Sequence, residues 1–117
     1  MPSDKPLQRL NDILENIEWI IEYTRGQRYA DFERGRLTRD AVERCLLRIS
    51  EAARKLEGVV DSIASDQPWA DIRSLGNVIR HEYDAVDPAV IWKIIEDDLP
   101  PLENAVQAAI KKLARER

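Results

Sequence analysis

Apolar residues recur at helical spacing along most of this chain, and this periodicity restricts its possible folds more than any other feature. Between residues 5 and 24 the large apolar side chains lie mostly three or four positions apart, at Leu10, Ile13, Leu14, Ile17, Ile20 and Ile21. That spacing places them on one face of an α-helix, whereas a half-buried β-strand alternates apolar and polar residues. Because no alternating segment or internal repeat occurs, the pattern predicts an all-α protein.

Residues that start and stop helices divide the sequence into five predicted helices. Thr38, Pro68 and the Asp87-Pro88 pair suit helix starts, since a short polar side chain caps free N–H groups and proline fits the first turn. Gly26 suits the end of the first helix, and a Pro-Pro pair at 100–101 interrupts the last part of the pattern. The predicted helices span residues 5–24, 38–63, 68–83, 88–99 and 102–114, with a short connector at Tyr29–Phe32.

Short connections between these helices favour an antiparallel up-and-down bundle. With 117 residues, 34% of them charged, the chain is predicted to form one helical domain over residues 1–117. No apolar run is long enough to cross a bilayer and no signal-peptide core follows the first residues, so we expect a cytoplasmic protein without membrane contact. One Cys and one His exclude an internal disulfide and a structural zinc site within the chain, and Cys45 is expected in the core.

Charge is distributed unevenly along this acidic chain, whose net charge is −4. Residues 25–55 contain nine Arg or Lys against five Asp or Glu, and residues 82–103 contain seven acids and one Lys. The first segment could form a basic surface that binds phosphates, or the two segments could pair with each other or with a second subunit. Thirteen of the eighteen cations are Arg, whose planar guanidinium suits phosphates and ion pairs better than Lys does.

The only histidine, His81, lies among other groups that bind or protonate phosphodiesters. Its neighbours along the chain include Asn77, Arg80 and Tyr83. If Arg73 marks the origin of a helical wheel, Asn77 lies at about 40°, Arg80 at about −20° and His81 at about 80°. This polar arc is either a catalytic site or an ordinary solvated helix face. The opposite face carries the expected core stripe, formed by Ile72, Leu75, Val78 and Ile79.

Several single residues have simpler interpretations. Gly76 lies inside the same predicted helix, where glycine costs about 1 kcal/mol relative to alanine, and a close approach of another backbone or a ligand would explain its presence. Trp69 and Trp92 are interpreted as core or interface anchors rather than base-stacking platforms. Glu51 either forms an ion pair with an Arg near the candidate site or is a solvated acid.

Three segments carry a resemblance to a known family through their order and spacing. They are residues 12–24, beginning Asp12-Ile13-Leu14, residues 41–53, which contain Ile49-Ser50-Glu51-Ala52, and residues 69–100. Over nearly the whole chain these segments resemble the HepT-like members of the HEPN superfamily, small helical proteins usually encoded beside a minimal nucleotidyltransferase. In the second segment this family usually has Ile-Gly-Glu-Ala.

The working motif of that family is Arg, then four to six residues, then His-x-Tyr, commonly beginning Arg-Asn. Asn77, His81 and Tyr83 match the motif, whereas Gly76 stands where its Arg would be. In the family this Arg is expected to hold the scissile phosphate, so its replacement bears directly on catalysis.

The resemblance implies a metal-independent endoribonuclease without a cofactor, which acts as the toxin of a toxin–antitoxin pair. Two copies pair in this family and the active cleft forms at their interface, so a homodimer is expected. The antitoxin would be the nucleotidyltransferase, which can transfer AMP to the motif tyrosine, here Tyr83. Because the motif Arg is replaced, a second interpretation stays open: a catalytically impaired binding or regulatory partner of a nucleotidyltransferase.

The residue chemistry is consistent with RNA cleavage by the RNA's own 2′-OH. Imidazole titrates at a pKa of about 6.5, so His81 could move protons at neutral pH, and two copies of it would supply both proton transfers. Arg80 or Arg73, on the same helical face, would bind the phosphate in a bidentate way. Asn77 could orient His81 or donate to a phosphate oxygen, and Tyr83 could contact the substrate.

Overall fold

The structure of the protein is a computed structural model that describes residues 5–81 and 86–116. Every regular element within these residues is helical, so the all-α prediction is confirmed. None of these helices is long and apolar enough to cross a membrane. The elements are α1 (Pro6–Thr24), α2 (Tyr29–Arg34), α3 (Arg36–Lys55), α4 (Val59–Ile63), α5 (Trp69–His81), α6 (Pro88–Lys93), a π-helical turn η1 (Ile94–Asp98) and α7 (Leu99–Arg115).

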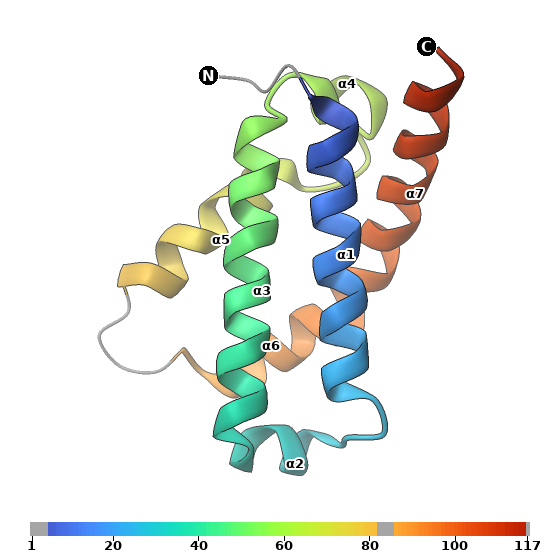
Figure 1. Cartoon of the computed structure of the whole chain (residues 1–117). Helices are drawn as coiled ribbons and strands as arrows, with labels where there is room; N and C mark the ends of the chain where they lie inside the picture. The colour runs from blue at the N-terminus through green and yellow to red at the C-terminus, as the bar shows by residue number, and fades with distance from the viewer. Residues whose placement is uncertain (1–4, 82–85, 117) are drawn as a thin grey trace.

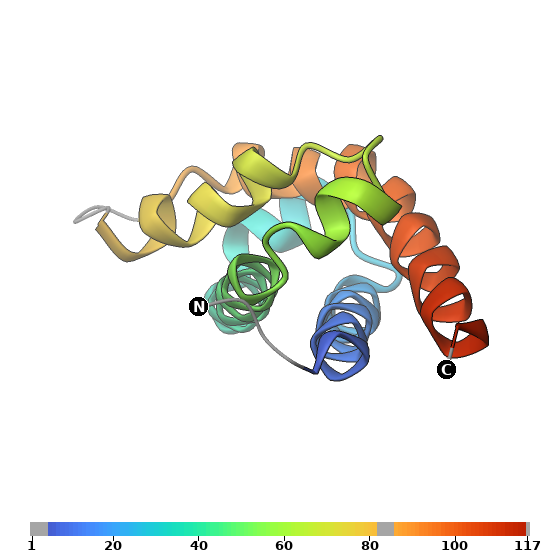
Figure 2. The same ribbon diagram turned by 90° about the horizontal axis from the view of Figure 1, so that it is seen from above.

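Helices α1 and α3 lie side by side and antiparallel at the centre of the bundle (Figure 1). Helix α7 packs against α1, and α5 packs against α3. Seen from above, α1 and α3 are viewed end-on, and α5, α6 and α7 cover one side of the pair (Figure 2). The predicted helical bundle is therefore confirmed, with α5 and α6 crossing the central pair obliquely.

The core lies where the predicted apolar stripes of α1, α3 and α7 meet. Burial of each large apolar side chain contributes about 1.5–3 kcal/mol to folding. Cys45 is 1% exposed within this core, and burial raises the pKa of its thiol, which confirms its predicted place. The fully or almost fully buried side chains include Leu10, Ile13, Ile17, Ile20, Val42, Leu46, Ile49, Leu102 and Val106.

The segment between α1 and α3 differs from the sequence prediction. The connector expected at Tyr29–Phe32 is the helix α2, which buries its aromatic Phe32 completely. The Asp31 carboxylate accepts a hydrogen bond from the Arg28 N–H at 2.9 Å and caps the first turn of α2. Helix α3 begins at Arg36, and only Gly35 separates it from α2, so the predicted start at a Thr38 cap is wrong.

The long helix predicted over residues 38–63 is divided into α3 and α4. Gly58 adopts a φ of +90°, a left-handed conformation that glycine reaches without strain, and it turns the chain between the two helices. The Asp61 carboxylate accepts from the Gly58 N–H at 2.8 Å and caps α4.

The break predicted at residues 100–101 is also wrong, because both prolines lie in the first turn of α7, where their missing N–H groups need no partner.

The two tryptophans singled out in the sequence anchor the fold, as predicted. Trp69 begins α5 with only 3% of its surface exposed, and its Nε1 donates to the Ala64 carbonyl at 2.7 Å. The ring of Trp92 lies with its centroid 6.3 Å from that of Tyr29 and 5.2 Å from that of Phe32. Trp92 thereby joins α6 to α2.

Helix α5 buries a narrower face than its sequence predicts. Ile72, Leu75 and Ile79 are partly buried against the core. Val78, which was predicted in the same stripe, is 47% exposed. The reason is that α5 packs mainly against α3, so its flanks stay open.

Candidate active site on helix α5

The middle of α5 is fixed to α3 by hydrogen bonds to its backbone. The Ser50 hydroxyl donates to the Arg73 carbonyl at 2.8 Å and accepts from the Gly76 N–H at 3.0 Å. Arg54 Nε donates to the same carbonyl at 3.2 Å. Because Ser50 is 1% exposed, these bonds lie in a protected environment and set the position of α5 on α3.

Gly76 is the point of closest approach between the two helices. A Cβ atom at this position would lie 2.7 Å from Ser50 Oγ and 3.2 Å from Ser50 Cβ. The close approach expected from the sequence is therefore present, although a side chain of α3 makes it rather than a backbone or a ligand. Any side chain at position 76, including the Arg of the resembled motif, would therefore require Ser50 or one of the two helices to shift.

Gly76→Ala should lower the free energy of unfolding by about 1–3 kcal/mol, the usual cost of an extra methyl group in a packed contact. In an open helix the same change would raise the stability of the protein by about 1 kcal/mol. A loss of stability in place of this gain would therefore show that Gly76 is in a packed contact. Urea denaturation of the two proteins measures it. In a Ser50→Gly protein, where the contacting side chain is absent, the same Gly76→Ala change should cost less stability than it does in the parent protein. A single variant as stable as the parent protein would contradict the packing argument.

Arg80 presents a solvent-exposed guanidinium beside Gly76 and Asn77. Its Nη2 donates to Asn77 Oδ1, one helical turn earlier, at 2.9 Å. The same Nη2 would lie 3.7 Å from a Cβ atom on Gly76. The guanidinium therefore turns back along the helix and occupies the space next to the position where the motif Arg is expected.

Arg73, the second cation proposed from the sequence, has a different environment. Its Nη2 and Nη1 lie 2.6 and 3.2 Å from the two carboxylate oxygens of Asp61, and its Nε donates to the Ala53 carbonyl at 3.2 Å. The Arg73 side chain is only 16% exposed. Its hydrogen bonds hold the pKa of Asp61 below the usual value. Arg73 thus joins α5 to α3 and α4, whereas Arg80 faces solvent.

The remaining motif residues lie at the end of α5 or beyond it. His81 is the last residue of α5 and follows Arg80 directly. Tyr83 lies outside the described residues, so its proposed contact with substrate and its modification stay predictions, as does the role of His81. Glu51 is exposed and forms no ion pair with the described residues, which agrees with the solvated-acid alternative.

Sequence reasoning missed Ser50, Arg54 and Asp61, the three side chains that hold α5 in place. The signal for Ser50 was present: it stands where the resembled family usually has Gly, in the segment that packs against Gly76. Among the described residues no three His, Cys, Asp or Glu side chains are arranged to hold a metal ion.

Comparisons with known proteins agree with the helical fold. The family model described as Ribonuclease HepT-like matches residues 13–109. A protein of Methanocaldococcus jannaschii named as a candidate RNase, MJ1380, is 33% identical over 84% of this chain and 90% of its own length. A protein of Thermococcus cleftensis named as a probable ribonuclease HepT is 34% identical over 81% of this chain and 86% of its own length. No solved structure matches with significance. The chain belongs to the HepT-like ribonuclease family.

Proposed function

We propose that this protein is a metal-independent endoribonuclease that acts in the cytoplasm as the toxin of a toxin–antitoxin pair. The observation that carries the proposal is the exposed Arg80 guanidinium, held by Asn77 at 2.9 Å and directly followed by His81. Phosphodiester cleavage needs a cation that stabilises charge and a group that moves protons, and Arg80 and the next residue of the sequence, His81, are residues of these two kinds. The family membership supports RNA as the substrate.

In the proposed reaction the RNA supplies its own nucleophile. A base removes the proton of the 2′-OH, the 2′-oxygen forms a bond to phosphorus, and the bond from phosphorus to the 5′-oxygen breaks as that oxygen gains a proton. The products are a 2′,3′-cyclic phosphate and a 5′-hydroxyl. His81 carries the protons in this proposal, since histidine is the side chain that ordinarily changes charge near neutral pH. Arg80 stabilises the charge on the phosphorane through a pair of parallel N–H bonds.

Asn77 orients the cation in this scheme. Its Oδ1 accepts from Arg80, which leaves the two N–H groups of its amide to donate to a phosphate oxygen.

One histidine per chain must serve two proton transfers, so the complete site takes His81 from each of two copies. The open flank of α5, where Val78 is 47% exposed, suits contact with that second copy. Light scattering of the purified protein should therefore give the mass of a dimer.

A second candidate function is favoured by Gly76. The motif Arg would require Ser50 or one of the two helices to shift, so the chain could have kept the fold and lost catalysis. It would then bind and regulate a nucleotidyltransferase, with Tyr83 as the residue that receives AMP. The exposed Arg80 guanidinium beside Gly76 favours the ribonuclease, because it returns a cation to the same place.

Expression of the chain with and without a nucleotidyltransferase encoded beside it tests these alternatives. The ribonuclease should arrest growth and degrade RNA when it is expressed alone. Co-expression should restore growth and raise the intact mass of the protein by one or more AMP groups, and Tyr83→Phe should remove that increase. A protein that leaves RNA intact when expressed alone, yet binds the nucleotidyltransferase, would support the binding partner instead.

A further inference from the structure

A pocket with an apolar floor and an acidic rim lies where α3, α5, η1 and α7 meet. Its volume is about 440 Å³, which is within the range of small-molecule sites. Buried side chains of α3 and α7 form the floor, and partly buried side chains of α5 and η1 form the walls. These apolar side chains include Leu46, Ile49, Leu99 and Leu102 in the floor and Ile72 and Ile94 in the walls.

Every charged residue that lines this pocket is an aspartate. The acidic rim consists of Asp66, Asp71, Asp97 and Asp98, all of them exposed. No Lys, Arg or His of the described residues lines the pocket, and none of the four aspartates forms an ion pair with a described residue. The lining therefore carries a negative charge that no cation of the lining offsets.

Helix stabilisation accounts for only part of the acidic rim. Asp71 and Asp97 lie in the first turns of α5 and η1, where a negative charge interacts favourably with the helix dipole. Asp66 lies in the connection before α5, outside any helix, and Asp98 precedes α7 without a capping hydrogen bond from its side chain. The π-helical turn η1 brings Ile94 and two aspartates to the pocket, and such turns are rare and frequently occur at functional sites.

The separation of the carboxylates determines which kind of cation fits the pocket. Two of them belong to the segment 66–71 and two to η1, so they stand on different walls. Among the described residues no three His, Cys, Asp or Glu side chains are arranged to hold a metal ion, so the rim does not converge on one ion. Separate negative charges above an apolar floor fit separate positive charges that an apolar chain joins.

We propose that this pocket binds a linear aliphatic polyamine, a molecule in which methylene chains join ammonium groups. The methylene chain lies on the apolar floor, where its removal from water favours binding. Its ammonium groups, which are donors only, donate to the carboxylates of the two walls. The proposal is independent of the ribonuclease function, because Asn77 and Arg80 do not line the pocket.

Calorimetric titration of the full-length protein with spermidine tests the proposal. The measurement is made at an ionic strength of about 0.15 M, where attraction between distant exposed charges is largely screened. The double variants Asp66→Asn/Asp71→Asn and Asp97→Asn/Asp98→Asn should each weaken binding about threefold to tenfold, the effect expected for the loss of two exposed charge pairs. Because each double variant changes a different wall, a folding defect in one, detected by circular dichroism, leaves the other as the test.

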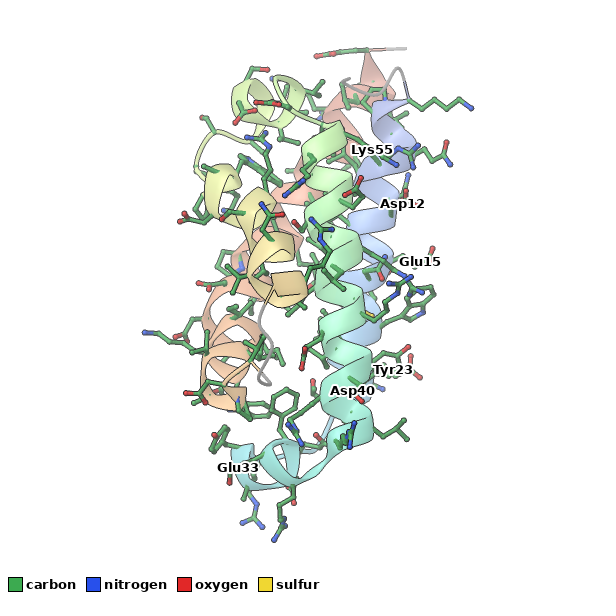
Figure 3. The ribbon with its side chains drawn as sticks, turned by 90° about the vertical axis from the view of Figure 1, so that its left-hand side faces the viewer. Asp12, Glu15, Tyr23, Glu33, Asp40 and Lys55 are labelled. Carbon is green, nitrogen blue, oxygen red and sulfur yellow. The ribbon has the colours of Figure 1, made fainter. Side chains whose placement is uncertain are left out.

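The double variant Glu33→Gln/Asp40→Asn is the matched control. It changes the net charge by the same amount at two exposed positions, on α2 and α3, that do not line the pocket (Figure 3). It should leave the affinity for spermidine unchanged. A loss of affinity equal to that of the pocket variants would show that spermidine responds to the net charge of the protein alone, and would overturn the proposal.

Two diamines of equal charge, 1,8-diaminooctane and 1,4-diaminobutane, test the apolar floor. The longer diamine should bind about tenfold more tightly, because its additional methylene groups leave water on binding. It should also raise the temperature of thermal unfolding further at the same concentration, since a ligand that binds only the folded state stabilises that state. Equal affinities of the two diamines, or an absence of spermidine binding to the parent protein, would overturn the proposal.

Discussion

Replacing His81 with alanine should abolish RNA cleavage and toxicity while leaving the helical fold intact. General acid–base catalysis by a positioned side chain contributes a factor of about 10²–10⁴ to the rate, and His81 is the only histidine of the chain. A dimer with two such residues loses both proton transfers in this variant. Cleavage of a labelled RNA by the purified protein measures the loss, and circular dichroism reports the fold.

His81→Gln provides the matched control, because glutamine keeps hydrogen-bonding groups but does not titrate. It should be as inactive as His81→Ala. Retained cleavage in both folded variants would remove His81 from the proton-transfer role. Loss of helical structure in both would assign His81 a structural role instead.

Arg80→Ala should lower the cleavage rate by about a hundredfold or more, the effect of removing one preorganised group that stabilises transition-state charge. Arg73→Ala should act differently. The Arg73 guanidinium is bound to Asp61 and to the Ala53 carbonyl, so its loss should lower the urea midpoint of unfolding more than the rate of the folded protein. Steady-state cleavage and urea denaturation of both variants separate the two effects.

The double variant Ser50→Gly/Gly76→Arg supplies a second check on the same cation. It replaces both residues at the closest contact between α3 and α5, and it gives each position the residue that the resembled family usually has there. Added to Arg80→Ala, the exchange should recover cleavage. A folded Arg80→Ala protein with the parent rate would show that the required cation comes from elsewhere.

Helical periodicity was sufficient to predict the all-α bundle, because each long helix has one apolar face that must be buried. Helix boundaries were less predictable, since they depend on single backbone conformations. Gly58 ends the α3 region by adopting a φ of +90°, yet a glycine inside an apolar periodic segment does not reveal its dihedral angle. The proline pair at 100–101 signals a break or a helix start equally well, and here it opens α7.

Local spacing was also sufficient to place Asn77 and Arg80 together, because they are one turn apart on one helix. It could not predict what holds that helix. Arg73 shared the polar arc on the helical wheel, but its partner Asp61 lies twelve positions earlier, in another helix. The contact between Ser50 and Gly76 likewise joins residues 26 positions apart. Such pairings depend on how helices cross, which periodicity does not determine.

The chemical identity of the RNA ends tests the central proposal most directly. Purified protein would be incubated with a labelled RNA in the presence of a chelator, and the new ends would be identified by mass spectrometry. We predict 5′-hydroxyl and 2′,3′-cyclic phosphate ends, formed by the unmodified protein and not by His81→Ala. New 5′-phosphate ends, or cleavage that requires an added divalent cation, would contradict cleavage by the 2′-OH with His81 as the proton carrier.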